Sequence, residues 1–175
     1  MTNKDDIQEL LPLVDDNGNV IGKATRGECH SDNTLLHPVV HLHVFNSKGE
    51  LYLQHRPAWK DIQPDKWDTA VGGHIRFGET VEDALLRETK EEIGLTNFSP
   101  RKICQYARHG ERESEFIYVF STTTDEQPKT GEEVDEGRFF SLKEMLSLFG
   151  KGFFTPNFEE EYSRLFLHKP TCNNA

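Results

Sequence analysis

Positive charge, cysteine and long apolar runs are all scarce in this sequence. Lysine and arginine together number 20 against 30 acidic residues, which gives a formal net charge of −10. A general nucleic-acid binder needs a basic footprint, so the charge excludes that class of partner. No apolar run reaches the roughly 18 residues that span a membrane. The first ten residues contain no apolar signal-peptide core. We therefore expect a cytoplasmic protein with no membrane partner.

Cysteine usage excludes two further classes of site. Cys29, Cys104 and Cys172 are odd in number, far apart and free of any CxxC pair, so neither a disulfide framework nor a thiolate zinc site is indicated. Histidine is more abundant, with eight residues, five of them between Cys29 and Arg56. In so acidic a chain, an anionic substrate needs bound cations or local basic residues at its site.

Strand and turn patterns predict a single α+β domain. Asp15 to Gly18 and Asn46 to Gly49 read as turns, because Asn and Gly tolerate positive φ. Mixed strands with few, separated helices favour an α+β or layered architecture. We expect the domain to span residues 10–169, between flexible segments at 1–9 and 170–175. Strands are expected at Leu10–Val14, Val20–Arg26, Pro38–Phe45, Leu51–Leu53, Trp67–Val71, Lys102–Ala107, Phe116–Thr122 and Gly137–Phe140. Helices are expected at Val81–Ile93, from the residue after Ser141 to about Phe149, and at Asn157–Leu167. A loop is expected at Pro57–Lys66.

The helix predicted at Val81–Ile93 carries an unusual set of carboxylates. Thr80 has capping-box spacing before it, and Gly94 is a natural C-terminal stop. Three glutamates at spacings of three and four fall in or beside its apolar stripe, and these are Glu88, Glu91 and Glu92. Like charges so placed repel, and burial adds a desolvation cost. A divalent cation among them resolves the conflict, and Mg²⁺ is typically shared with substrate phosphates. The alternative is a solvated acidic face.

The segment GHIRFGETVEDALLRETKEEIGL, residues 73–95, resembles the Nudix box. That pattern is Gly, five residues, Glu, seven residues, then Arg-Glu-aliphatic-x-Glu-Glu-x-Gly-aliphatic. Thr89 departs from it where an aliphatic residue is usual, at a packing position. Eight positions match at the right spacing over 23 residues, and these are Gly73, Glu79, Arg87, Glu88, Glu91, Glu92, Gly94 and Leu95.

The resemblance implies an α/β/α sandwich with a mixed central sheet and an N-terminal β-hairpin. It also implies a hydrolase that uses Mg²⁺ or Mn²⁺ to direct water onto phosphorus in a small diphosphate compound. Arg87 would orient a carboxylate, Glu79 would support the loop or the metal shell, and Gly73 would lie at the substrate. The general base stays open between Glu133, Glu136 and other residues. The metal ligands implied by the box are Glu88, Glu91 and Glu92.

The layout from about Leu13 to Phe140 is also similar to the isopentenyl-diphosphate isomerase branch of this superfamily. The resemblance implies a second divalent-metal site, whose mixed imidazole and carboxylate ligands suit Mn²⁺, Zn²⁺ or Fe²⁺. Its ligands would be His30, His37, His74, Glu113 and Glu115. The diphosphate-binding residues implied in the same way are Arg26, Arg56 and Lys60.

Two departures favour a hydrolase over an isomerase. The isomerases have a catalytic cysteine just before the Gly-His pair, where this chain has Gly72. Their box usually lacks counterparts of Glu88 and Glu91, which this chain retains. A non-catalytic metabolite sensor is the third alternative.

Oligomeric state is expected from base rates alone, which favour a homodimer. Core packing or base stacking stays open for Trp59, Trp67 and Phe154, and a structural role is expected for His41, His43, His55 and His109.

Overall fold

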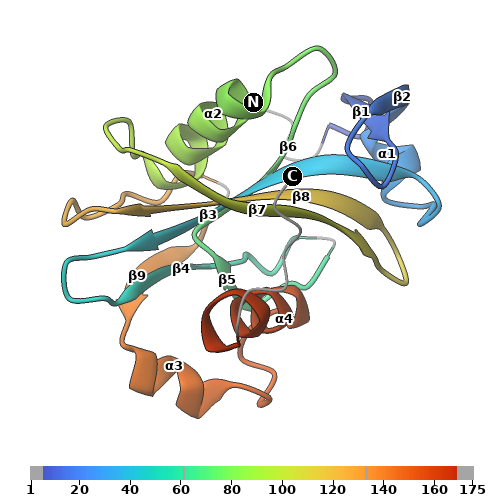
Figure 1. Ribbon diagram of the computed structural model, residues 1–175. Coiled ribbons are helices and arrows are strands. Elements are labelled where there is room, and N and C mark those ends of the chain that lie inside the picture. The colour runs from blue at the N-terminus through green and yellow to red at the C-terminus, as the bar shows by residue number, and fades with distance from the viewer. Residues whose placement is uncertain (1–5, 61, 133, 169–175) are drawn as a thin grey trace.

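The computed structural model describes residues 6–60, 62–132 and 134–168 and builds them around one mixed β-sheet (Figure 1). The strands are β3 (Leu36–Phe45), β4 (Leu51–His55), β5 (Trp67–Thr69), β6 (Val71–His74), β7 (Arg101–His109), β8 (Ser114–Thr123) and β9 (Glu136–Phe140). The path runs β5-β4-β3-β8-β7, with β6 added to β3 and β9 added to β4. Because β3 pairs in parallel with β8 and antiparallel with β4 and β6, the prediction of a mixed central sheet is confirmed.

Helices cover both faces of this sheet, as Figure 1 shows. On one side lies α2 (Val81–Ile93), whose Leu85 and Ile93 are buried against the sheet. On the other lie α3 (Leu142–Leu148) and α4 (Pro156–Tyr162), the latter continuing as a π-helical turn, Ser163–Leu167. Burial of each large aliphatic side chain stabilises the fold by about 1.5–3 kcal/mol. The predicted α/β/α sandwich is therefore confirmed.

A separate N-terminal hairpin positions the first histidine of the site. It consists of β1 (Leu10–Val14) and β2 (Val20–Thr25), followed by the short helix α1 (Arg26–Cys29). The predicted turn is present, with Gly18 at φ 83°. The prediction that the second strand includes Arg26 was wrong by one residue, because Thr25 and Glu28 form a capping box that starts α1. The helix ends at His30 and so directs the chain toward β3.

The strand predicted at Trp67–Val71 is in fact two strands. At Ala70 the chain changes neighbours, since β5 pairs with β4 whereas β6 pairs with β3. No Gly or Pro marks this break in the sequence. The consequence is that His74 lies on a strand, opposite Val39 of β3.

The chain ends were predicted to be flexible. Residues 1–5 and 170–175 lie outside the described residues. Within residues 6–9, the carbonyls of Ile7 and Glu9 accept hydrogen bonds from the backbone N–H groups of Gly27 (3.0 Å) and Arg26 (2.8 Å). This part of the chain is therefore tied to α1. In the described part of the chain no helix is both long and apolar enough to cross a membrane.

Candidate active site

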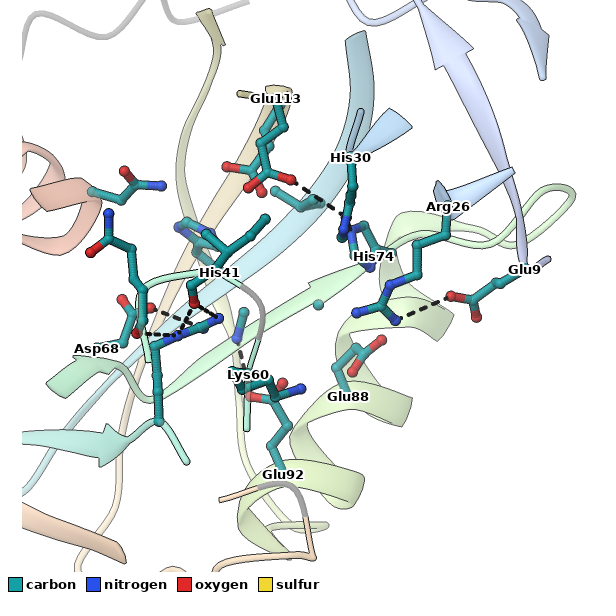
Figure 2. A pocket seen from close by; sticks show the side chains of 18 of the residues that line it. Glu9, Arg26, His30, His41, Lys60, Asp68, His74, Glu88, Glu92 and Glu113 are labelled. Carbon is teal, nitrogen blue, oxygen red and sulfur yellow. Dashed lines mark hydrogen bonds and ion pairs between the residues drawn. The ribbon is translucent and has the colours of Figure 1, made fainter. Parts of the chain in front are cut away.

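One cavity of about 900 Å³ is lined by residues of both predicted ligand sets, although His37 and Glu79 are not part of its lining. Figure 2 shows Glu88 and Glu92 projecting into it from α2, with His30, His74 and Glu113 on the strand side. Because the carboxylates of α2 line the same cavity as His30 and His74, the two sets can act on one bound molecule.

The glutamates are aimed by a well-defined helix. Thr80 caps α2 by accepting from the Asp83 N–H, and Gly94 ends it in the left-handed conformation at φ 65°. Glu92 accepts hydrogen bonds from Gln54 Nε2 (2.8 Å) and from the Gly72 N–H (3.2 Å). Burial, reinforced by the charge of Glu88, raises the pKa of Glu92 to about 8.

Glu88 and Glu91 differ in environment. Burial raises the pKa of Glu88, although the neighbouring Arg87 acts in the opposite direction. The Glu91 side chain is 55% exposed at the cavity mouth, 3.5 Å from Arg87 Nη1. Two half-buried carboxylates and one exposed carboxylate therefore line the same cavity. Such a group needs a cation to be stable in its charged form.

Arg87 holds the loop before α2 in place. Its Nε and Nη2 each donate to Glu79 at 2.8 Å, Nη2 also donates to the His74 carbonyl at 3.0 Å, and Nη1 donates to Glu88. Burial tends to raise the pKa of Glu79, but the hydrogen bonds from Arg87 outweigh it and lower the pKa. Both oxygens of Glu79 are thus engaged, which favours the supporting role over that of a metal ligand.

The predicted histidine and glutamate ligands also converge. Two groups, one of His30, His37 and His74 and one of His37, Glu113 and Glu115, each have ligand atoms within 4.8 Å of one another. The Nε2 atoms of His30 and His74 lie 3.0 Å apart. His30 ends α1, His37, His74 and Glu115 lie on β3, β6 and β8, and Glu113 directly precedes β8. The register of these strands therefore brings the residues together.

The chemistry of this cluster fits a divalent cation. His37 is fully buried, and neither of its ring nitrogens has a hydrogen-bond partner within the described part of the chain. Burial, with the charge of His30, lowers its pKa to about 4, so the ring is a neutral ligand. Burial, with the charge of Glu115, raises the pKa of Glu113 to about 8. A metal would satisfy the orphaned nitrogens and neutralise the carboxylates together.

The three basic residues predicted to bind diphosphate all line the cavity, but they differ in their contacts. Arg56 donates to the carbonyls of Ile62 and Gln63 and lies 3.3 Å from Asp68, so its guanidinium also anchors the loop after β4. Arg26 lies 3.8 Å from Glu9. Lys60 lies over the ring of Trp59, and its charge acts on Glu92.

Other sequence expectations have simple outcomes. Trp67 and Phe154 are buried in the core and therefore have a packing role. Trp59, in contrast, is 42% exposed. Thr89 is fully buried, as expected of a packing position. Glu136 is exposed at the start of β9, and Glu133 lies outside the described residues. His41 was expected to be structural only, yet it lines the cavity.

Comparison with known proteins agrees with this geometry. A family model of the NUDIX domain matches residues 35–166. The chain belongs to the Nudix family. An uncharacterized Nudix hydrolase of Listeria monocytogenes is 31% identical over 153 residues, covering 86% of this chain and 90% of that protein. An isopentenyl-diphosphate Delta-isomerase of Photorhabdus laumondii is 29% identical over 164 residues, covering 89% and 93%.

One further relative and one solved structure are also similar to this chain. An uncharacterized Nudix hydrolase of a Nostoc strain is 44% identical over 87 residues, but this match spans only about half of each protein, 50% of this chain and 52% of the other. A crystal structure of a Deinococcus radiodurans protein superposes with a TM-score of 0.79 at 25% identity, covering 90% of this chain and 99% of that one. The resemblance to the Nudix family and its isomerase-like branch is thus confirmed.

Gly73 of the Nudix box leaves space for the side chain of Glu88. A Cβ built at Gly73 would lie 2.1 Å from Cδ and 2.3 Å from Cγ of Glu88. We expect Gly73→Ala to push Glu88 out of the cavity and lower kcat by about 10–100-fold, the range for displaced metal-site residues. The melting temperature should change little, because the Glu88 side chain can rotate. Gly22→Ala, whose Cβ meets Leu13 at an ordinary 3.8 Å, is the control. Equal kcat values for the two variants would contradict this role.

The buried carboxylates should also make the metal-free protein pH-sensitive. Burial raises the pKa of Glu92 to about 8 in the folded protein, whereas the pKa of this carboxyl is near its ordinary 4.5 in the unfolded chain. The folded state therefore binds more protons between these values, and the free energy of unfolding falls as pH rises from 4.5 to 8. With chelator present, we expect the melting temperature of Glu92→Gln to exceed that of wild type by several degrees at pH 8, and by less at pH 5. A difference independent of pH would contradict the assignment.

Proposed function

We propose that this protein is a hydrolase that cleaves a diphosphate linkage in a nucleoside-diphosphate or other small diphosphate compound. The observation that carries the proposal is the intact carboxylate set of α2, with Glu88 and Glu92 half-buried on the wall of a cavity of about 900 Å³. A protein that only binds a metabolite has no evident need for two half-buried carboxylates whose charges repel.

The residues of the Nudix box have different roles in this proposal. Glu88, Glu91 and Glu92 would hold Mg²⁺ or Mn²⁺, which lowers the pKa of a water molecule and neutralises charge on phosphate oxygens. Arg87 and Glu79 fix the position of Glu88 and of the loop. Lys60 adds positive charge beside Glu92, where the anionic substrate must lie.

We further propose that the cluster of His30, His37, His74, Glu113 and Glu115 binds a second divalent ion. The unpartnered nitrogens of His37 support this assignment. The mixture of imidazole and carboxylate ligands favours Mn²⁺, Zn²⁺ or Fe²⁺ over Mg²⁺. Arg26 and Arg56 line the cavity close to these ligands and would contact the substrate's phosphates.

The proposal is tested by incubating the protein with a panel of diphosphates in Mg²⁺, with Mn²⁺ in parallel, and identifying products by mass. The panel contains nucleoside diphosphate sugars, dinucleotide cofactors, nucleoside triphosphates and isopentenyl diphosphate. Cleavage of at least one compound, lost in Glu92→Gln, supports a hydrolase. Absence of cleavage across the panel in both metals would count against it.

Isomerisation of a five-carbon diphosphate is the second candidate. The convergent histidine cluster and the similarity to named isopentenyl-diphosphate isomerases favour it. Gly72 argues against it, because this position offers no thiol for proton transfer. Incubation with isopentenyl diphosphate in D₂O decides the question, since an isomerase incorporates deuterium into the carbon skeleton and a hydrolase does not.

A further inference from the structure

A buried polar network lies behind the cavity wall, between the sheet and α4. Its centre is Glu161, whose side chain is 2% exposed. The carboxylate accepts hydrogen bonds from His41 Nδ1 (2.9 and 3.1 Å to its two oxygens), from His43 Nε2 (2.8 Å) and from the Tyr106 hydroxyl (2.6 Å). A buried carboxylate with three donors is fixed in place and stays ionised.

The network favours the protonated form of the His41 ring. Burial alone would lower the pKa of His41, but the charge and hydrogen bond of Glu161 outweigh it and raise the pKa to about 9, with smaller contributions from Glu115 and Asp68. Correspondingly, burial would raise the pKa of Glu161, but His41 holds it well below its usual range. In the protonated ring Nδ1–H is bound to Glu161, and Nε2 carries a second proton that it can donate.

The second ring nitrogen of His41 lies at the cavity. His41 of β3 pairs with Gly72 of β6, and a Cβ built at Gly72 would lie 3.8 Å from His41 Nε2. Among the described residues, the hydrogen bonds of His41 all involve Nδ1. Its side chain is 14% exposed and lines the cavity, and Figure 2 shows it among the cavity residues, near Asp68. The glycine therefore leaves a proton donor uncovered.

We propose that His41 contacts the substrate, with Nε2–H donating a hydrogen bond to an anionic phosphate oxygen, and that Glu161 is its positioning residue. This inference rests on the proposed function, because it assigns the ligand of this cavity as a diphosphate. A protonated imidazole is no metal ligand, so His41 is distinct in role from His30, His37 and His74. Its charge is compensated by Glu161 from behind, which leaves its N–H for the substrate.

Direct binding of a non-hydrolysable diphosphate tests the contact. Methylenediphosphonate is titrated with Mg²⁺ into wild type, His41→Gln and the control His109→Gln, a histidine on the far end of β7 that pairs with Asp16. Loss of a charge-assisted hydrogen bond should weaken binding by about 10–100-fold in His41→Gln. His109→Gln should bind like wild type. Equal affinity of wild type and His41→Gln, or no binding to wild type, overturns the proposal.

A second variant guards against misfolding of the first. Gly72→Val leaves the His41–Glu161 pair intact but places a branched side chain across Nε2. The backbone of Gly72 is not in the left-handed region, so valine is sterically allowed there. We expect the same loss of affinity, with the ¹⁵N resonances of the His41 ring no longer shifted by methylenediphosphonate. A ring that still responds in Gly72→Val would also overturn the proposal.

The two proposals can fail separately. If methylenediphosphonate binds and depends on His41 while no diphosphate in the panel is cleaved, the hydrolase proposal fails and the contact stands. If diphosphates are cleaved and His41→Gln has unchanged KM and kcat, the contact fails and the hydrolase proposal stands. Glu161→Gln extends the test, since a positioning role predicts a raised KM and an altered pH profile, whereas a purely structural role lowers the melting temperature alone.

Discussion

Replacing Glu92 with glutamine should lower kcat on the order of 10³-fold while preserving the fold. Charge stabilisation by a bound metal contributes several kcal/mol to the transition state, and each 1.36 kcal/mol corresponds to tenfold in rate. The substitution removes one ligand charge but keeps an amide oxygen that can still accept from Gln54 and from the Gly72 N–H. Steady-state kinetics at saturating Mg²⁺ measures the effect.

The matched control for this variant is Glu82→Gln. Glu82 is an exposed glutamate in the first turn of the same helix, outside the cavity lining. Its kcat should equal that of wild type. A Glu92→Gln variant that retains full activity, with an unchanged circular dichroism spectrum, would show that the α2 carboxylates do not hold the catalytic metal.

Replacing His37 with asparagine should abolish tight binding at the proposed second metal site. His37 belongs to both ligand groups, so its loss leaves each of them incomplete. Changing even a supporting residue of a metal site costs about 10–100-fold in affinity, and we expect at least the upper value for a ligand. Titration calorimetry with Mn²⁺ or Zn²⁺, with bound metal counted by mass spectrometry, measures the change.

The same variant should keep its fold in the absence of metal. In chelator, His37→Asn should be only modestly less stable than wild type, because the ring nitrogens have no hydrogen-bond partners among the described residues, although the smaller side chain leaves a void. His109→Asn serves as the control for metal binding. An unchanged metal content in His37→Asn would mean that the cluster is a polar core without an ion.

The parts of the site carried by one helix were predictable from sequence. Glu88, Glu91 and Glu92 lie within five residues, so a helical period alone places them together, and Thr80 and Gly94 mark the ends of that helix. The histidine cluster needed the family resemblance, because the register of β3 with β6 and β8 brings its members together. Local spacing does not encode that register.

The role of His41 could be predicted only in part from the sequence. Its alternation with His43 correctly predicted that both lie on one face of a strand, and both bind Glu161. Glu161, however, is 120 residues away from His41 on a helix whose acidic run looks like a solvated surface. The break at Ala70 was missed for a similar reason, because the change of strand neighbours there is a tertiary effect.

The most direct test of the account is hydrolysis in oxygen-18-labelled water. The protein is incubated with Mg²⁺ and a diphosphate that the panel identifies as a substrate, and the phosphate products are analysed by mass. The account predicts a single oxygen-18 atom in one phosphate product, formed on the order of 10³-fold more slowly with Glu92→Gln. Release of no labelled phosphate, together with deuterium uptake into isopentenyl diphosphate in D₂O, would contradict the account and make the histidine cluster the centre of an isomerase.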